Sequence, residues 1–207
     1  MPDSHEPLIF IVSGPSGSGK STLVRKLLEL PGIMLSISAT TRPPRASEKD
    51  GKWYHFVEEE EFRKMVARGE FLEHACVFGK HSYGTPKKSL DEARTQKKDL
   101  VLEIDVQGAA QVRKEVPESV SIFIVPPSHE ELEKRLRARG QDNNDEIGRR
   151  LERARLEIEH YVDYDYVVIN EHLEQAGKDV RVIALGARCR TRQNRERVQR
   201  ILKSFGG

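Results

Sequence analysis

The sequence predicts an α/β fold in which a three-layer core with a parallel sheet carries two insertions. Along most of the chain, β-branched apolar segments alternate with amphipathic helical segments. Strands separated by helices in this way pair in parallel, and helices cover both faces of their sheet. The alternation is broken at residues 38–86, which predict a small mixed α/β insertion, and at 127–155, which predict a helical lid. The core then consists of residues 1–37, 87–126 and 156–207.

The core elements follow from hydrophobic periodicity. Each predicted strand is a short apolar run, and each predicted helix places its apolar residues on one face. The predicted strands are residues 8–13, 99–105, 119–125 and 166–169, and the predicted helices are 22–30, 109–116 and 130–139.

The first insertion combines strand-like segments at 35–39, 53–57 and 72–78 with one helix, in which Phe62 and Met65 lie one turn apart. The lid contains a run of polar residues at 139–150 that is too polar to bury. A second amphipathic helix follows this run, so we expect the run to form a mobile lid tip.

Composition excludes several classes of protein. The 207 residues include 35 basic and 33 acidic ones, a balance that does not favour general polyanion binding. Cys76 and Cys189 lie far apart, which argues against a disulfide framework or a zinc site, and the histidines show no metal-ligand spacing. The longest apolar run is 8–12, and residues 1–7 carry two acids. We therefore expect a soluble, cytoplasmic protein without a membrane partner.

Basic charge is concentrated near the C-terminus. Residues 178–207 hold nine basic residues against Asp179 and Glu196. An apolar stripe runs through the same segment, which predicts a helix that packs on another surface. Its members are Val198, Ile201, Leu202 and Phe205. A nucleic-acid-binding tail is the alternative, but a solvated helix face is favoured, so nucleic acid is not an expected partner. The sequence predicts no particular oligomeric state.

Residues 14–21 fit the pattern G-x-x-x-x-G-K-[ST] of a P-loop. The motif follows a predicted buried strand and precedes a predicted helix, so a chance match is disfavoured. The glycines let backbone N–H groups approach phosphate, Lys20 reaches the β and γ oxygens, and Ser21 can hold Mg²⁺. The core is thus predicted to be a P-loop core that binds a Mg²⁺-bound nucleoside triphosphate. The predicted triphosphate-binding residues are Gly14, Pro15, Ser16, Gly17, Ser18, Gly19, Lys20, Ser21 and Thr22.

A second anion site is predicted around Arg42 and Arg45. Two prolines between these arginines stiffen the loop and prevent a helix. Two guanidinium groups held in this way suit a phosphate dianion. The chain has no N-K-x-D guanine motif of a GTPase, and two insertions favour a kinase that brings two small substrates together.

Further motifs complete a family pattern. Ser38-Ala-Thr-Thr-Arg42-x-x-Arg45 is followed by Glu48, Gly51 and Tyr54. Downstream, in order, stand Phe71-Leu-Glu73, Tyr83-Gly-Thr85, Glu103-Ile-Asp105-x-Gln-Gly108 and Arg135-Leu-x-x-Arg139-Gly140. Over residues 8–172 the chain resembles guanylate kinases, which are nucleoside monophosphate kinases with the P-loop fold. Residues 80–82 are one residue longer than the common family form at this point.

The resemblance implies a role for each matching residue. The phosphate of GMP would be held by Arg42, Arg45, Tyr54 and Tyr83. The guanine would be recognised by Ser38, Glu73 and Thr85. Glu103 and Asp105 would border the GMP site and order the Mg²⁺ shell, through water. The catalytic set would be Lys20, Arg45, Arg139 and Arg150, with Arg135 and Asn170 on the ATP side.

Glu73 suits guanine chemically. Guanine presents N1–H and an exocyclic NH₂ side by side, and one carboxylate can accept from both. Adenine presents a bare N1 at the same place. Simpler interpretations remain for single residues: the tyrosines could be core aromatics, Glu73 an exposed acid, and the lid arginines partners in i, i+4 ion pairs.

These features predict an enzyme that uses ATP and Mg²⁺ to convert GMP to GDP. The main alternative is a catalytically inactive guanylate-kinase-like module that binds phosphopeptides. Such modules usually have a degraded P-loop, whereas Lys20 and Ser21 are intact here. A kinase for another mononucleotide is disfavoured by Glu73 together with Ser38.

Overall fold

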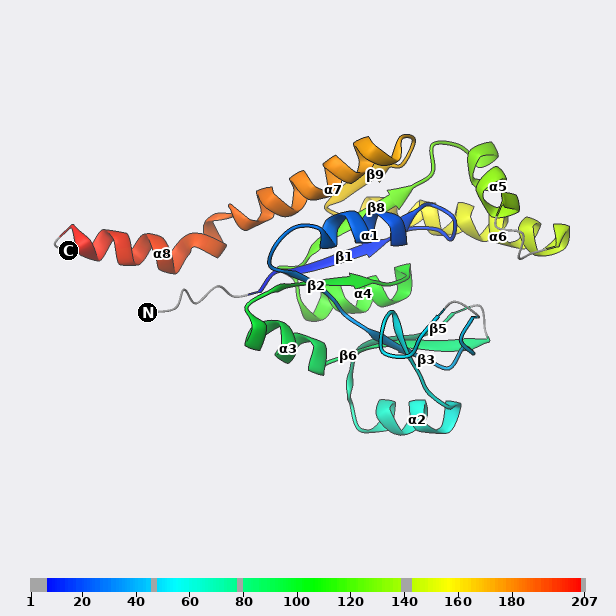
Figure 1. Cartoon of the computed structure of the whole chain (residues 1–207), viewed down its shortest axis with the longest axis horizontal. Helices are drawn as coiled ribbons and strands as arrows, with labels where there is room; N and C mark the ends of the chain where they lie inside the picture. Colours follow the sequence, from blue (N-terminus) through cyan, green and yellow to red (C-terminus); the bar gives the residue numbers. More distant parts are fainter. Residues whose placement is uncertain (1–6, 46–47, 78–79, 139–142, 206–207) are drawn as a thin grey trace.

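The structure, a computed structural model, describes residues 7–45, 48–77, 80–138 and 143–205 and contains two sheets (Figure 1). The larger sheet is entirely parallel and has the order β2-β7-β1-β8-β9. Its strands are β1 (Ile9–Ser13), β2 (Ile33–Leu35), β7 (Asp99–Glu103), β8 (Val120–Val125) and β9 (Tyr166–Ile169). The predicted α/β class with a parallel core sheet is therefore confirmed.

Helices cover both faces of the larger sheet, which gives three layers (Figure 1). On one face, α1 (Lys20–Leu28) and α7 (Leu173–Arg188) pack residues such as Leu23 and Val180 against the strands. On the other, α3 (Lys88–Gln96) and α4 (Val106–Glu115) contribute Ala93 and Val112. The central strand β1 is almost entirely buried, because its residues 9–12 are apolar and helices cover both faces of the sheet. All strand carboxyl ends meet at one edge, where ligands of α/β proteins bind.

The smaller sheet has the order β4-β3-β6-β5 and lies beside the core (Figure 1). It is formed by β3 (Ser38–Thr40), β4 (Tyr54–Phe56), β5 (Phe71–Val77) and β6 (His81–Pro86). Helix α2 (Glu59–Ala67) covers it, with the ring of Phe62 stacked on that of Phe71 at 4.7 Å between centroids.

Three local features differ from the sequence-based expectation. Residues 35–39 are not one strand: β2 ends at Leu35 in the core sheet, the Ser36 N–H donates to the Val101 carbonyl, and β3 begins at Ser38 in the other sheet. Strand β6 was not predicted, because Gly84 and Pro86 weaken its pattern and its register comes from pairing with β5. Helix α3 was not predicted, because it buries only Ser89 and Ala93.

The predicted lid region contains two packed helices, α5 (His129–Ala138) and α6 (Asn144–Ile158), followed by the short 3₁₀ helix η1 (Glu159–Asp163). Leu132 and Leu136 of α5 pack against Ala154 of α6. Asn143 caps α6 by accepting a hydrogen bond from the Glu146 N–H at 2.9 Å. The predicted lid tip includes residues 139–142, which lie outside the described residues.

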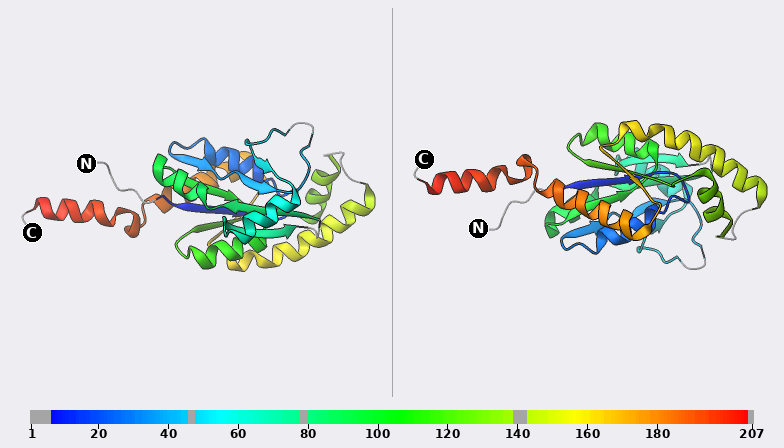
Figure 2. Two further views of the ribbon diagram at one scale, coloured as in Figure 1. Left: turned by 90° about the horizontal axis from the view of Figure 1, so that it is seen from below. Right: turned by 90° about the horizontal axis from the view of Figure 1, so that it is seen from above.

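The C-terminal segment forms two helices with different environments. Helix α7 is anchored to the core, where Arg188 Nε donates to the fully buried carboxylate of Asp99 at 2.7 Å. Helix α8 (Thr191–Ser204) buries no residue and projects from the body, opposite the lid helices (Figure 2). The expectation that its apolar stripe packs on another surface is not met within the described residues, since Phe205 is 85% exposed. None of the helices in the described ranges is long and apolar enough to span a membrane.

Removing α8 should therefore change little in the isolated chain. We expect truncation after Arg190 to preserve turnover, and to alter the urea midpoint only slightly, because no side chain of α8 is buried. The Asp99–Arg188 pair is retained in this variant. Steady-state kinetics and urea denaturation check both points, and a large loss of turnover would show that α8 contributes to the site. Salt-dependent duplex binding that disappears on truncation would support the nucleic-acid alternative instead.

Candidate active site

The P-loop wraps tightly over the end of the core sheet. Gly14 has a φ of 136°, and a Cβ there would lie 2.1 Å from the Ile124 carbonyl oxygen, so only glycine fits. Lys20, in the first turn of α1, donates from Nζ to the carbonyl oxygens of Gly14 and Pro15. A cavity of about 160 Å³ lies inside the loop. It is lined by Pro15, Ser16, Gly17, Gly19, Lys20, Ser21 and Thr22, all within the predicted triphosphate-binding set.

Asn170, just after β9, supports this loop from outside. Its buried side chain donates from Nδ2 to the Ser18 carbonyl at 2.8 Å. A Cβ on Gly19 would lie 2.2 Å from the same nitrogen, so glycine lets the two groups approach. Arg135 donates from Nη2 to the Asn170 backbone oxygen at 2.9 Å and from Nε to Glu131 at 2.8 Å. Asn170 thus contacts the P-loop directly, and Arg135 contacts Asn170. Arg135 also forms the i, i+4 ion pair, with Glu131, that was the simpler interpretation of the lid arginines.

Ser21, at the start of α1, and Glu103, at the end of β7, form a pair of oxygen-bearing side chains. The Ser21 hydroxyl donates to Glu103 Oε1 at 2.6 Å. Asp105, two residues further on, caps α4 by accepting from the Gly108 N–H at 2.9 Å. Within the described residues no group of three or more His, Cys, Asp or Glu side chains could hold a metal by itself. The hydroxyl and carboxylate oxygens of Ser21 and Glu103 are of the kind that Mg²⁺ accepts as ligands, and Mg²⁺ binds few protein oxygens and completes its shell with phosphates and water.

Arg42 is held rigidly among acidic and aromatic groups. Its Nη2 donates to both carboxylate oxygens of Glu48 at 2.9 Å, and its Nε donates to the Tyr83 hydroxyl at 3.2 Å. The guanidinium carbon lies 5.6 Å from the centre of the Tyr54 ring. Burial opposes the charge of Arg42, but the hydrogen bonds to Glu48 and Tyr83 prevail and raise its pKa. Glu48, which the sequence showed only as a motif position, therefore orients Arg42.

A cavity of about 540 Å³ opens beside Arg42 and carries mostly positive charge. Its charged lining residues are Arg25, Arg42, Arg45, Lys52, Glu48 and Glu103. A second cavity of about 190 Å³ shares four lining residues with the first and also touches Gly14 and Lys20 of the P-loop. The shared residues are Ser38, Tyr54, Tyr83 and Glu103. The predicted monophosphate pocket and the P-loop therefore adjoin each other.

Glu73 lies at the smaller cavity and is 4% exposed, so its interpretation as an exposed surface acid is wrong. The Thr85 hydroxyl donates to Glu73 Oε1 at 2.6 Å, and Ser38 lines the same cavity. Burial raises the pKa of Glu73 to about 7; the hydrogen bond from Thr85 opposes this shift, and the charge of Asp105 adds to it. The three residues predicted to recognise guanine are thus buried polar residues of the smaller sheet, on β3, β5 and β6.

Helix α4 fixes the position of Glu73 from the core side. A Cβ on Gly108 would lie 2.4 Å from Glu73 Oε2, so only glycine allows this approach. Gln111, one turn later, donates from Nε2 to the His74 carbonyl at 2.9 Å and accepts from the His74 N–H at 3.3 Å. These contacts attach β5 to the core. Sequence reasoning quoted Gly108 as a motif residue without this role and missed Gln111, because neither contact is local in sequence.

The predicted catalytic arginines, Arg45 of the first insertion and Arg139 and Arg150 of the lid, are only partly described. Arg45 lines the larger cavity, and Arg150 lies on α6 with its Nε 3.8 Å from Glu146 Oε1. Arg139 lies outside the described residues. Glu157, two turns after Arg150 on the same helix, lines the smaller cavity and was missed from sequence. Burial raises the pKa of this carboxyl, although the charges of Lys20 and Arg153 oppose the shift.

Comparison with known proteins identifies a family for this chain. A family model described as guanylate kinase matches residues 6–184. The chain is 48% identical over 198 residues to a guanylate kinase of Nitrosomonas europaea, covering 95% of this chain and 98% of the relative. It is 52% identical over 176 residues to a guanylate kinase of Dechloromonas aromatica, covering 84% and 87%. The crystal structure of a guanylate kinase from Anaplasma phagocytophilum superposes with a TM-score of 0.72 at 40% identity, covering 88% and 86%.

Proposed function

The chain belongs to the guanylate kinase family and is a phosphotransferase, and we propose that it converts ATP and GMP to ADP and GDP with Mg²⁺. The observation that carries this proposal is the buried Glu73 carboxylate in a cavity that also touches Lys20 of the P-loop. A guanine-selective acid and a phosphate-binding loop thus face one space. The direct test is GMP-dependent formation of ADP by the purified protein.

On the ATP side, the P-loop N–H groups and Lys20 bind the phosphates. Phosphoryl transfer spreads negative charge over the transferred group, so catalysis depends on positive charge and positioning rather than on a covalent nucleophile. Lys20 is oriented by the Gly14 and Pro15 carbonyls and supplies a fixed cation. Ser21 and Glu103 would hold Mg²⁺, which neutralises phosphate charge when bound. Asn170 and Arg135 keep the loop in this conformation.

On the acceptor side, Arg42, Arg45, Tyr54 and Tyr83 would hold the GMP phosphate. Arg42 is preorganised by Glu48 and Tyr83, so little side-chain entropy is lost when phosphate binds. Glu73 would accept hydrogen bonds from guanine N1–H and NH₂, with Ser38 and Thr85 beside it. We further propose that 38–86 acts as the GMP-binding insertion, that 127–155 acts as the lid, and that the protein works in the cytoplasm.

Arg45 and the two lid arginines, Arg139 and Arg150, should affect the chemical step more than ATP binding. We expect Arg45→Ala, Arg139→Ala and Arg150→Ala each to lower kcat, by on the order of 10³-fold, because such arginines stabilise charge that develops in the transition state. The KM for ATP should change much less. The matched control is Arg155→Ala. Arg155 is an exposed residue of α6 that pairs with Glu159 at 3.0 Å. Near-normal kcat in all three variants would show that the lid assignment is wrong.

The use of GMP should depend on the ionisation of Glu73. Its pKa in the free protein is about 7, so the side chain is largely neutral below that pH and a carboxylate above it. Only the carboxylate accepts from both guanine donors, so kcat/KM for GMP should rise with pH through about 7 and then level off. Glu73→Gln, which cannot ionise, should lose this step. If the wild type and Glu73→Gln showed the same pH profile of kcat/KM, ionisation of Glu73 would not be the cause of the rise near pH 7.

A further inference from the structure

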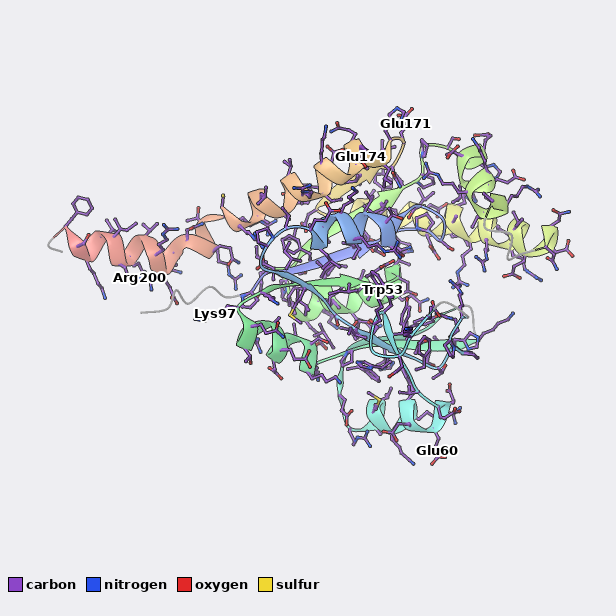
Figure 3. The ribbon with its side chains drawn as sticks, in the orientation of Figure 1. Trp53, Glu60, Lys97, Glu171, Glu174 and Arg200 are labelled. Carbon is purple, nitrogen blue, oxygen red and sulfur yellow. The ribbon has the colours of Figure 1, made fainter. Side chains whose placement is uncertain are left out.

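Arg25 and Trp53 connect the two halves of the molecule. Arg25 lies on α1, the helix that begins at the P-loop, and Trp53 directly precedes β4 of the smaller sheet. The Arg25 guanidinium carbon lies over the Trp53 ring, 5.1 Å from its centre. Trp53 is half-buried at the junction between the core and the smaller sheet (Figure 3). A cation held over the face of an indole ring is the most favourable cation–π arrangement.

Both side chains line the larger cavity, together with Arg42 and Arg45. Ser21 also lines it, and Ser21 and Arg25 are four residues apart, so they share one face of α1. One helix face therefore presents Ser21 on the ATP side and Arg25 on the acceptor side. Neither Arg25 nor Trp53 belongs to the residues that the family resemblance assigns to GMP.

The charge of its lining indicates that this cavity receives an anion. Its four cations outnumber the two acids Glu48 and Glu103, and Glu48 is already paired with Arg42 through both oxygens.

We propose that Arg25 binds the phosphate of the acceptor nucleotide from the P-loop helix, and that Trp53 is the positioning residue that holds the Arg25 guanidinium in place. This inference rests on the proposed GMP phosphorylation. It extends the Arg42 and Arg45 clamp across the cavity, so that the acceptor phosphate is bound from both sides. The phosphate is then fixed relative to Ser21 and Lys20, which lie on the same helix as Arg25.

The first test measures GMP binding without catalysis. Trp53 is the single tryptophan of the chain, so all indole emission reports on this position. We expect GMP to change the emission saturably, and Arg25→Gln to weaken that binding by on the order of 10-fold, the value of a charge-assisted contact. Guanosine, which lacks the phosphate, should bind both proteins equally. Arg63→Gln, an exposed change on α2, is the matched control and should behave as wild type.

The second test uses steady-state kinetics. Arg25→Gln should raise the KM for GMP while kcat and the KM for ATP stay nearly constant, and Arg25→Lys should recover part of the loss because it keeps the charge. Trp53→Phe should be milder than Trp53→Leu, since phenylalanine retains an aromatic face. In the Arg25→Gln background, Trp53→Leu should add little, because the two residues act as one unit.

The possible outcomes separate the two proposals. Wild-type protein that neither binds nor phosphorylates GMP would refute the proposed function. Wild-type protein that phosphorylates GMP, with an Arg25→Gln variant of unchanged GMP affinity, would refute only the role of Arg25. Equal weakening of guanosine and GMP would also refute it, because the effect would then not depend on the phosphate.

Discussion

Lys20→Ala is expected to lower turnover by on the order of 10³-fold or more while leaving the fold intact. Lys20 lies in the first turn of α1, and its ammonium group donates to two P-loop carbonyls, so we expect its charge to act on the transferring group with little reorganisation. Such a preorganised charge contributes most in the transition state. The loss should therefore appear in kcat measured with saturating ATP and GMP.

The control for this variant is Lys64→Ala, which removes an exposed lysine of α2 that pairs with Glu60 at 2.8 Å. Both variants should show wild-type circular dichroism and similar urea midpoints. If Lys20→Ala retained robust turnover with an unchanged fold, the P-loop would not be part of the mechanism.

Glu73→Gln is expected to lower kcat/KM for GMP sharply and to raise kcat/KM for AMP, so the preference for GMP over AMP should narrow. The carboxylate can accept from two guanine donors, whereas adenine leaves its charge desolvated and unpaired. A site built in this way can reject the analogue that lacks the donors by roughly 10⁴-fold. Glutamine has nearly the same shape as glutamate, so it should still fit in the tight space beside Gly108. Because it replaces one hydrogen-bond acceptor by a donor, it should no longer recognise guanine.

The measurement is kcat/KM for GMP and AMP on the wild type, on Glu73→Gln and on Glu70→Gln. Glu70 precedes β5 and pairs at the surface with Arg68, so its variant has the same charge change close to Glu73. The proposed phosphate clamp of Arg42, Arg45, Tyr54 and Tyr83 is not expected to contact the base and should still bind either mononucleotide. An unchanged GMP/AMP ratio in Glu73→Gln would show that the base is recognised elsewhere.

The sequence predicted the parts of the fold that depend on local pattern. The apolar run that forms β1, the glycine spacing after it and the helix that follows are adjacent in the chain, so one motif describes all three, although α1 begins at Lys20, two residues before its predicted start. The pattern could not show that residues 35–39 divide between two sheets, since that depends on pairing with β7 and β6. It also could not show that α8 projects without packing, because an apolar stripe indicates a surface to cover but not its partner.

The sequence predicted which residues form the candidate site, but it did not predict the contacts that hold these residues in position. Arg42 and Tyr83 are 41 residues apart in the chain, and only the family resemblance assigned them to one site. In the structure, Arg42 Nε donates to the Tyr83 hydroxyl at 3.2 Å. The roles of Glu48, Gly108 and Glu157 arise from packing between distant segments, which no spacing in the sequence encodes. The contact between Arg25 and Trp53 is of the same kind.

The central claim is tested most directly by identifying the product formed from each acceptor. Purified protein is incubated with ATP and Mg²⁺ and with GMP, AMP, UMP or CMP, and the nucleotides are separated by chromatography. We predict that GDP and ADP form in equal amounts from GMP, that the other acceptors react far more slowly, and that chelating Mg²⁺ stops the reaction. GMP binding without any GDP would contradict the account and favour the inactive phosphopeptide-binding alternative, and equal use of all four acceptors would contradict the assigned base recognition.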